Sequence, residues 1–239
     1  LEEALRGATG RTIKEIKIGD KTYMLKDINP NSQGIGSVSN EIRCADWYHY
    51  NDLGPKTYLI QDKVPRRMRF LPDKTQHRLL MEKVDGVNVK DIVLNPGDVE
   101  RWFPGRGQAV KRQIELSLGQ SFETIPEAYV AFARSVTNDK NLMKEIDKAR
   151  KLLKTSFSNT DDVQFMLQPT TSVKPGKFNF IDSGMNTMAK NYGGNNPYST
   201  GEFDYIMDIF YKVSKADPTG DMPWVNVPGG DPFEIMITR

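Results

Sequence analysis

The amino-acid sequence predicts an α+β fold with a strand-rich N-terminal part and a longer, mainly helical C-terminal part. Apolar runs of the β type are concentrated before residue 85, and apolar residues at helical spacing dominate from about residue 108. Such segregation of strands from helices is typical of α+β proteins rather than of alternating βα units. A chain of 239 residues can bury the core of one domain or of two small lobes, and we expect two lobes with a cleft between them.

The N-terminal part contains most of the strand signals. Gly19-Asp20 separates two β-type runs and predicts a hairpin turn. A helical pattern follows, with Ser39 or Asn40 as its N-cap. The expected elements are a hairpin over 13–28, a helix over 37–50, and strands over 56–64 and 77–84.

The C-terminal part contains amphipathic helices and one short hairpin. Thr124 and Glu127 have the spacing of a capping box, and Pro126 lies in the first turn of the same helix. The expected elements are helices over 124–137 and 139–156, strands over 163–167 and 177–181, a helix around 203–210 and an irregular tail from residue 216.

Composition excludes several classes of function. The net charge is +2 with 27% charged residues, so we expect no nucleic-acid partner, and we interpret the basic run 63–74 as a solvated loop. No apolar stretch approaches the roughly 20 residues that span a bilayer, so we expect no membrane insertion. One cysteine excludes an internal disulfide, and with two histidines it disfavours a structural zinc site. The first residue is not Met, so we expect a fragment of a longer protein.

Three features before residue 85 have both a structural and a functional interpretation. Gly7 and Gly10 form either a flexible turn or a loop whose amides approach a phosphate closely. Lys26 ends an apolar strand, where it is either solvated or bound to an anionic group. Glu41 is either an acid favoured by the helix dipole or the ion-pair partner that orients Lys26.

Asp182 also has two interpretations. It ends the apolar run “FNFID” and is followed by Ser183-Gly184. Asp and Gly occur in turns for reasons of backbone geometry alone. The alternative is that the carboxylate holds a metal ion at the mouth of a cleft.

Several segments, taken in order, resemble the motifs of protein kinases. “GATGRTI” resembles a shortened glycine-rich loop, “YMLK” the strand with the phosphate-binding lysine, and “LLMEKVDG” the gatekeeper and hinge. The resemblance implies that Glu41 is the helix partner of Lys26. It also implies that Met81 is the gatekeeper and that Glu82 and Val84 present backbone groups to adenine. The residues implied to bind ATP are Gly7, Gly10, Lys26, Met81, Glu82 and Val84.

The second half of the resemblance concerns catalysis and metal binding. “FIDSG” resembles the Asp-Phe-Gly motif with Ser183 in place of Phe. “NTDDVQFML” resembles the shortened catalytic loop of kinase-like domains in bacterial toxins and secreted effectors. The resemblance implies that Asp162 faces the acceptor hydroxyl, with Asp161 as the competing choice. Gln164 and Asp182 are implied to hold Mg²⁺.

The departures from the kinase pattern are as informative as the matches. No His-Arg-Asp or Ala-Pro-Glu motif occurs, and one clear helix follows “DSG”, with Asp204 implied to brace the catalytic loop. The resemblance therefore implies a two-lobed protein kinase-like fold, with a small β-rich N-lobe over 1–84 and a reduced, mainly helical C-lobe over 85–239.

The implied function is that of an atypical, minimal protein kinase. Asp162, Lys26 and Glu41 would be its catalytic residues, and ATP and Mg²⁺ its cofactors. The resemblance implies an effector or toxin that a bacterium secretes into the host cytoplasm, where it would phosphorylate a hydroxyl of a host protein and could require a host activator. Two alternatives remain: a protein AMP-transferase on the same fold, and a catalytically inactive interaction module.

Overall fold

The computed structural model of the chain describes residues 5–6, 12–28, 38–64, 74–160, 162–182, 186–188 and 200–226. The chain divides into two compact units. We call Leu1–Val84 with Ser183–Thr187 the N-terminal unit, and Asp85–Asp182 with Met188–Arg239 the C-terminal unit. The strands of an antiparallel sheet come first along the chain and most helices follow them, which confirms the predicted segregation of strands and helices.

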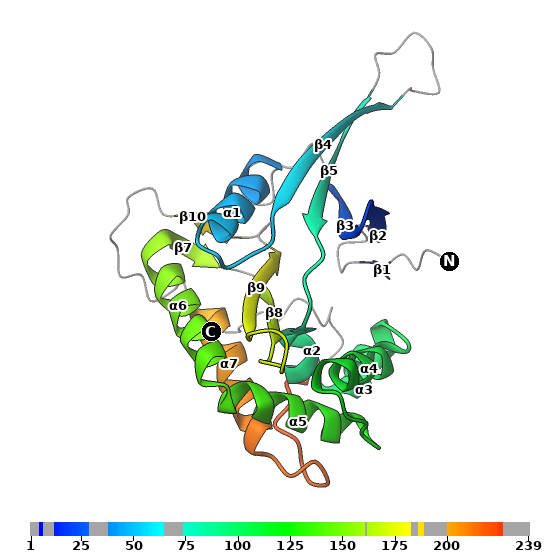
Figure 1. Cartoon of the computed structure of the whole chain (residues 1–239), viewed down its shortest axis with the longest axis vertical. Helices are drawn as coiled ribbons and strands as arrows, with labels where there is room; N and C mark the ends of the chain where they lie inside the picture. Colours follow the sequence, from blue (N-terminus) through cyan, green and yellow to red (C-terminus); the bar gives the residue numbers. More distant parts are fainter. Residues whose placement is uncertain are drawn as a thin grey trace. The chain divides into compact units, whose positions relative to one another are not determined.

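The N-terminal unit contains a five-stranded antiparallel sheet in the order β1-β2-β3-β5-β4 (Figure 1). The predicted hairpin is confirmed, and Gly19 lies in its turn with φ of +60°, a conformation that glycine adopts without steric cost. The predicted strands over 56–64 and 77–84 are also confirmed. The strands are β1 (Leu5–Arg6), β2 (Thr12–Ile18), β3 (Lys21–Ile28), β4 (Thr57–Val64) and β5 (Lys74–Glu82).

Helix α1 (Val38–Tyr50) is the helix of the N-terminal unit, and it buries Cys44 and Tyr48. Its prediction is confirmed, but the predicted N-cap is wrong because Ser39 and Asn40 lie inside the first turn. Ser37, Ser39 and Asn40 all have a similar capping preference, so the sequence does not specify which of them precedes the helix.

The C-terminal unit becomes helical earlier than the sequence indicated. Three helices, α2 (Val89–Val93), α3 (Pro96–Trp102) and α4 (Arg106–Leu118), begin before or near residue 108. The side chains of Asn88 and Asn95 cap α2 and α3 by accepting hydrogen bonds from backbone N–H groups two residues later. Helices of five and seven residues are too short to show a helical period, so our expectation for this region was wrong.

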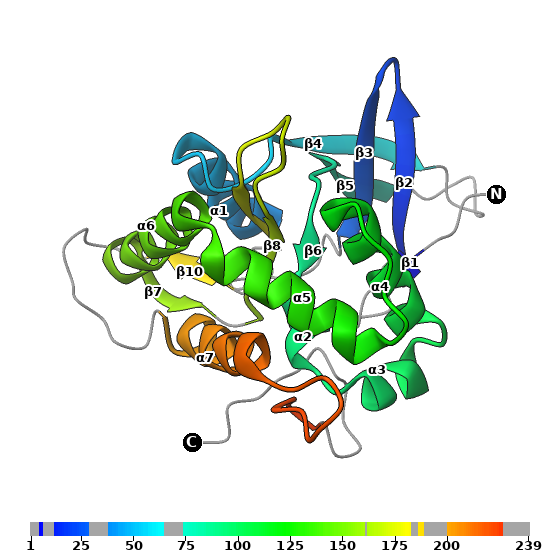
Figure 2. The same cartoon turned by 60° about the horizontal axis from the view of Figure 1, so that its bottom comes forward.

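The three longer helices of the C-terminal unit match the predicted segments. They are α5 (Ile125–Asn138), α6 (Lys140–Ser156) and α7 (Gly201–Lys215), and α5 packs against α4, α6 and α7 (Figure 2). The capping box is confirmed, because Thr124 accepts from the Glu127 backbone and Glu127 accepts from the Thr124 backbone. Phe132 and Phe210 meet edge to face, with ring centroids 6.3 Å apart, and join α5 to α7.

A small antiparallel sheet in the order β6-β8-β9 lies in the same unit. Strands β8 (Gln164–Gln168) and β9 (Lys177–Asp182) form the predicted hairpin, whereas β6 (Val87–Asn88) was not predicted. Gly86 precedes β6 with φ of +123°, and an added Cβ would lie 2.7 Å from the Leu167 carbonyl oxygen, so only glycine fits this close approach. The remaining strands are β7 (Phe157–Thr160) and β10 (Asn186–Met188).

Four buried phenylalanines join this sheet to the start of α7. Their neighbouring ring centroids lie 4.7–6.3 Å apart, the range in which aromatic pairs attract. The cluster fixes the strands that carry Gln164 and Asp182 against the helix turn that carries Glu202. Its members are Phe165, Phe178, Phe180 and Phe203.

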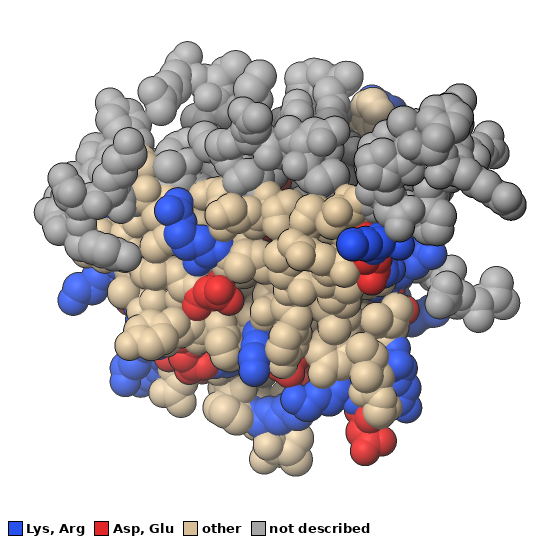
Figure 3. Space-filling view, turned by 90° about the horizontal axis from the view of Figure 1, so that it is seen from above, with Lys and Arg blue, Asp and Glu red and all other residues tan. Residues whose placement is uncertain are grey.

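On the face shown in Figure 3, Lys and Arg are interspersed with Asp and Glu among the described residues, so this face has charges of both signs. Within the described ranges, no helix combines the length and apolar character needed to cross a membrane.

Candidate functional site

In the N-terminal unit, the end of β3 is joined to the first turn of α1 by an ion pair. Lys26 Nζ donates to Glu41 Oε1 over 2.7 Å. The Lys26 side chain is 18% exposed and that of Glu41 is 3% exposed. The pair was one of two interpretations left open by the sequence. Because the Glu41 side chain is covered and that of Lys26 keeps some access to solvent, Lys26 can be held in place and still meet an anion.

The residues predicted as gatekeeper and hinge, Met81, Glu82 and Val84, lie at or just after the end of β5 in the same unit. Met81 is half-buried and stands opposite Met24 in the sheet register. The Glu82 N–H donates to the Lys56 carbonyl, and Lys21 Nζ donates to Glu82 Oε1 over 2.9 Å. The Glu82 amide hydrogen is therefore already engaged. Its carbonyl and the backbone of Val84 remain our prediction for adenine binding.

Four residues named by the sequence interpretation, Gly7, Gly10, Asp161 and Ser183, lie outside the described residues. Their proposed roles stay predictions.

In the C-terminal unit, Asp162 follows β7 with φ of +51°, in the left-handed region. Few residues other than glycine occur there, and Asp is one that tolerates it. Lys90 Nζ donates to Asp162 Oδ1 over 2.7 Å, while 35% of the Asp162 side chain remains exposed. The Asp162 backbone thus has a conformation that is uncommon for a residue other than glycine. Its carboxylate is bound to Lys90, and part of its side chain remains exposed.

Lys90 itself is fully buried in α2, with 0% exposure, and it has a second carboxylate partner. Its Nζ lies 2.9 Å from Glu202 Oε1, which makes the contact an ion pair. Burial lowers the pKa of Lys90, but the two carboxylates outweigh this effect, and the net shift is upward.

Asp162 and Glu202 share this environment. Burial is the largest effect on each and raises the pKa of both carboxyl groups, while Lys90 opposes it. The nearby Asp182 raises the pKa of Asp162 further by repulsion between like charges. A carboxyl group whose pKa lies above its ordinary value accepts a proton more readily than a solvated aspartate.

Gln164 and Asp182 are register partners on β8 and β9. Gln164 Nε2 lies 3.4 and 3.5 Å from the two Asp162 carboxylate oxygens, and its Oε1 accepts from Asn88 Nδ2 over 3.4 Å. An amide oxygen keeps a second lone pair when it accepts one hydrogen bond. The pair therefore supplies one carboxylate and one amide oxygen from adjacent strands.

A metal site made by protein ligands alone is not found in the described part of the chain, where no three His, Cys, Asp or Glu side chains gather. Mg²⁺ in phosphate-binding sites does not require such a group, because it keeps several waters and takes one or two protein ligands plus phosphate oxygens. Gln164 and Asp182 fit this second arrangement.

The sequence interpretation assigned Asp204 to brace the catalytic loop, but the described contacts of its side chain are with Arg150 and Thr200. Asp204 Oδ1 lies 2.7 Å from Arg150 Nε of α6, and its Oδ2 accepts from Thr200 Oγ1 over 2.8 Å. Glu202, two residues earlier in the same helix turn, contacts Lys90. Glu202 is therefore the acid of this turn that is linked to Asp162 through Lys90.

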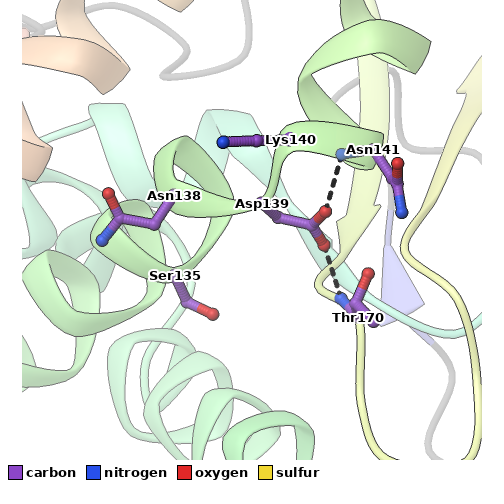
Figure 4. A pocket seen from close by; sticks show the side chains of 6 residues that line it. All are labelled: Ser135, Asn138, Asp139, Lys140, Asn141 and Thr170. Atoms are coloured by element: carbon purple, nitrogen blue, oxygen red, sulfur yellow. Dashed lines mark hydrogen bonds between the residues drawn. The ribbon is translucent and has the colours of Figure 1, made fainter.

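An open pocket of about 380 Å³ lies at the junction between the end of α5 and the start of α6 (Figure 4). Its only carboxylate, that of Asp139, caps α6 through Oδ1 and accepts from the Thr170 N–H through Oδ2. These bonds lower the pKa of Asp139 against the opposing effect of its burial. We therefore assign this pocket a structural role. It is lined by Ser135, Asn138, Asp139, Lys140, Asn141 and Thr170.

Sequence reasoning missed Lys90 and Glu202. The available signal for Lys90 was a lysine-aspartate pair in the middle of the apolar run “VNVKDIV”. Two charged residues between apolar neighbours must find partners if the run is buried. Glu202 carried no comparable signal, because acids are ordinary in the first turn of a helix.

No protein-family model matches the chain. No curated protein sequence matches it either. Among solved structures, “WaaP in complex with acyl carrier protein” aligns with 90% of this chain and 68% of its own, at 10% identity and a TM-score of 0.37. A TM-score this low does not establish a common fold, so the functional assignment depends on the contacts within each unit.

Proposed function

We propose that the chain is an ATP-dependent phosphotransferase that moves the γ-phosphoryl group of ATP to a hydroxyl group and releases ADP. The observation that carries the proposal is the ion pair between Lys26 and Glu41, 2.7 Å apart. A partly exposed amine fixed by a buried carboxylate is suited to bind phosphate oxygens, because its charge is already in position when the ligand arrives. We assign it to the α- and β-phosphates.

Asp162 would act on the acceptor side. The acceptor oxygen attacks the γ-phosphorus, the bond from that phosphorus to the β–γ bridging oxygen breaks, and the hydroxyl proton passes to the Asp162 carboxylate. The raised pKa of Asp162, caused first by its burial, makes this carboxylate a better proton acceptor than a solvated aspartate. Its exposed fraction leaves room for an acceptor.

Asp182 and Gln164 would hold Mg²⁺. When bound, the ion neutralises charge on the phosphate oxygens. The fit rests on the chemistry of the donors, a carboxylate and an amide oxygen on register-paired residues, both hard ligands of the type that Mg²⁺ prefers.

The finer parts of the proposal concern the acceptor and the setting. We propose a protein hydroxyl as acceptor, and a bacterial effector or toxin that acts in the host cytoplasm. Both extend the resemblance of the motifs to minimal effector kinases and have no support from the contacts described above.

A second candidate function is a binding module without turnover. The observation that favours it is the contact of Asp162 with buried Lys90, because this ion pair opposes the effect of burial on the pKa of Asp162 and occupies one carboxylate oxygen. Under this alternative, the chain would bind a nucleotide or a protein partner through the same residues and transfer nothing.

The test is a transfer assay with Mg²⁺ and ATP labelled at the γ- or the α-phosphate, in a eukaryotic lysate that supplies acceptors and any activator. We expect label on proteins from the γ-position alone. Asp162→Asn should lower the rate about 10²- to 10⁴-fold, the usual contribution of a general base. The matched control is Lys17→Met, which removes an exposed lysine from neighbouring strand β2 and should leave the rate unchanged.

Three outcomes would contradict the proposal in different ways. Label from the α-position would indicate AMP transfer. Full activity in both Asp162→Asn and Lys26→Met would show that the assigned residues are not the site. Absence of label from either position, with Mg·ATP still bound, would favour the binding module.

A further inference from the structure

Lys90 belongs to a group of three interacting charges around Asp162, which we call the ring and which consists of Asp162, Lys90 and Glu202. Lys90 Nζ lies 2.7 Å from Asp162 Oδ1 and 2.9 Å from Glu202 Oε1. Because both carboxylates contact the same ammonium group, they also repel each other. Each charge of the ring therefore acts on the other two.

The ring holds a residue that is unfavourable in its backbone conformation. Asp162 has φ of +51°, and non-glycine residues persist at such angles when the surrounding contacts fix them. The contact with Lys90 fixes the Asp162 carboxylate, and the contact of Lys90 with Glu202 fixes the ammonium group in turn. Removal of Lys90 leaves the turn free to relax to a more ordinary conformation.

Lys90 cannot take part in the reaction directly. Its side chain has no exposed surface, so neither a nucleotide nor an acceptor can touch it. Any effect of Lys90 on transfer must therefore pass through Asp162. Glu202 is nearly as buried, with 7% exposure.

We infer that Lys90 and Glu202 are positioning residues that hold the Asp162 carboxylate toward the acceptor hydroxyl. This inference rests on the proposed function. It assigns a role to two residues that belong to none of the motifs named in the sequence, on helices α2 and α7. Misplacement of a reacting group by about 1 Å costs about 100-fold in rate, so loss of the ring should have an effect of that size.

The alternative is an ion pair that only stabilises the C-terminal unit, and helix α2 provides a matched control. The residue after Lys90, Asp91, is 4% exposed and forms two hydrogen bonds of 2.9 Å with Arg106 of α4. This second pair starts from the same short helix, has a cation that is 27% exposed, and touches neither Asp162 nor Glu202 in the described contacts. Arg106→Met therefore removes the partner of a buried carboxylate on α2 without opening the ring.

The first measurement is of kcat and the KM for ATP in Lys90→Met and Arg106→Met. We expect Lys90→Met to lower kcat about 100-fold and to leave the KM for ATP within about twofold, because the nucleotide is held elsewhere. Arg106→Met should keep kcat within about threefold of the original chain. Equal losses of kcat in the two variants, or no loss in Lys90→Met, would overturn the inference.

The second measurement does not depend on activity. Hydrogen exchange at the Val163 amide should become at least about tenfold faster in Lys90→Met, and should not change in Arg106→Met, because Val163 follows Asp162 directly and the contact of Asp162 with Lys90 holds this turn. Unchanged exchange at Val163 in Lys90→Met would overturn the inference even if the chain transferred no phosphate. An inactive original chain would overturn the proposed function, and the exchange result would still decide the inference.

A third variant covers the case in which Lys90→Met does not fold. Glu202→Gln keeps the size of the side chain but removes one of the two charges that face Lys90. We expect it to lower kcat about tenfold, again with an unchanged KM for ATP, since the ring is weakened and not removed. Wild-type kcat in folded Glu202→Gln would overturn the inference.

Discussion

The two units each contain a lysine bound to a carboxylate, and the two lysines differ in what they can reach. Lys26 has one described carboxylate partner, Glu41, and is 18% exposed. Lys90 has two, Asp162 and Glu202, and is not exposed at all. A lysine with residual access can bind a ligand itself, whereas a sealed lysine acts only on the groups that it touches. Under the proposed function, the same pair of residue types would serve nucleotide recognition in one unit and positioning of Asp162 in the other.

The largest expected effect on stability is that of Lys90→Met. The substitution leaves the carboxylates of Asp162 and Glu202 facing each other without their shared cation. Removing one member of a buried ion pair costs about 3–5 kcal/mol, so we expect a loss of that size in the free energy of unfolding. Urea unfolding measures it, with the exposed Lys174→Met, expected within about 0.5 kcal/mol of the original chain, as the control. A loss below that of the control would remove the distinction drawn between the two lysines.

Lys26→Met should have a smaller effect on stability and a larger one on ligand binding. Glu41 stays buried when its partner is removed, but Lys26 was never fully withdrawn from water, so we expect a loss of about 1–3 kcal/mol. Added Mg·ATP should then fail to raise the midpoint of thermal unfolding of Lys26→Met, although it raises that of the original chain. Equal stabilisation of both proteins by Mg·ATP would contradict the role assigned to Lys26.

The pH dependence sharpens the comparison further. The two carboxylates raise the pKa of Lys90 above its ordinary value of 10.5, so the folded state holds this proton more tightly than the unfolded state. The stabilisation is fully present below pH 10.5 and is lost as the pH rises through the pKa of the folded state. The difference in unfolding free energy between the original chain and Lys90→Met should therefore shrink above pH 10.5. Chemical unfolding from pH 8 to 11.5, a range chosen to span about one unit beyond that value, measures it, and a difference that grew with pH would have the wrong sign.

The smallest effect expected among these variants is that of Thr124→Ala. Thr124 caps α5 in the same unit as Lys90, and the hydrogen bond that its hydroxyl accepts from the Glu127 N–H is exposed and involves no charged group. Loss of an N-cap costs about 1 kcal/mol, with no change in kcat and no dependence on pH between 8 and 11. Unfolding curves at two pH values check both points and separate general loss of stability from loss of the charged ring.

Sequence reasoning recovered the elements whose signals are local. The Gly19 turn, the capping box at Thr124 and the amphipathic helices were all predicted, because each depends on residues within a few positions of one another. The ion pair of Lys26 with Glu41 was one of two interpretations, and the structure selected it.

The remainder depended on contacts between distant parts of the chain. Lys90 and Asp162 are 72 positions apart, and Glu202 lies on a third element, so no local pattern predicts their meeting. The short helix α2 gave no period, and β6 contains two residues. Sequence therefore predicts which residues can carry charge into the interior, and tertiary structure decides which of them meet.

Direct binding of Mg·ATP tests the central claim, that Lys26 meets the nucleotide and Lys90 does not. Isothermal titration would compare the original chain with Lys26→Met, Lys90→Met and the surface control Lys17→Met. We expect Lys26→Met to weaken binding at least about tenfold, since it removes a charge-assisted contact to phosphate, and the other two to bind like the original chain. Wild-type affinity in Lys26→Met, or loss of binding in a folded Lys90→Met, would contradict the account.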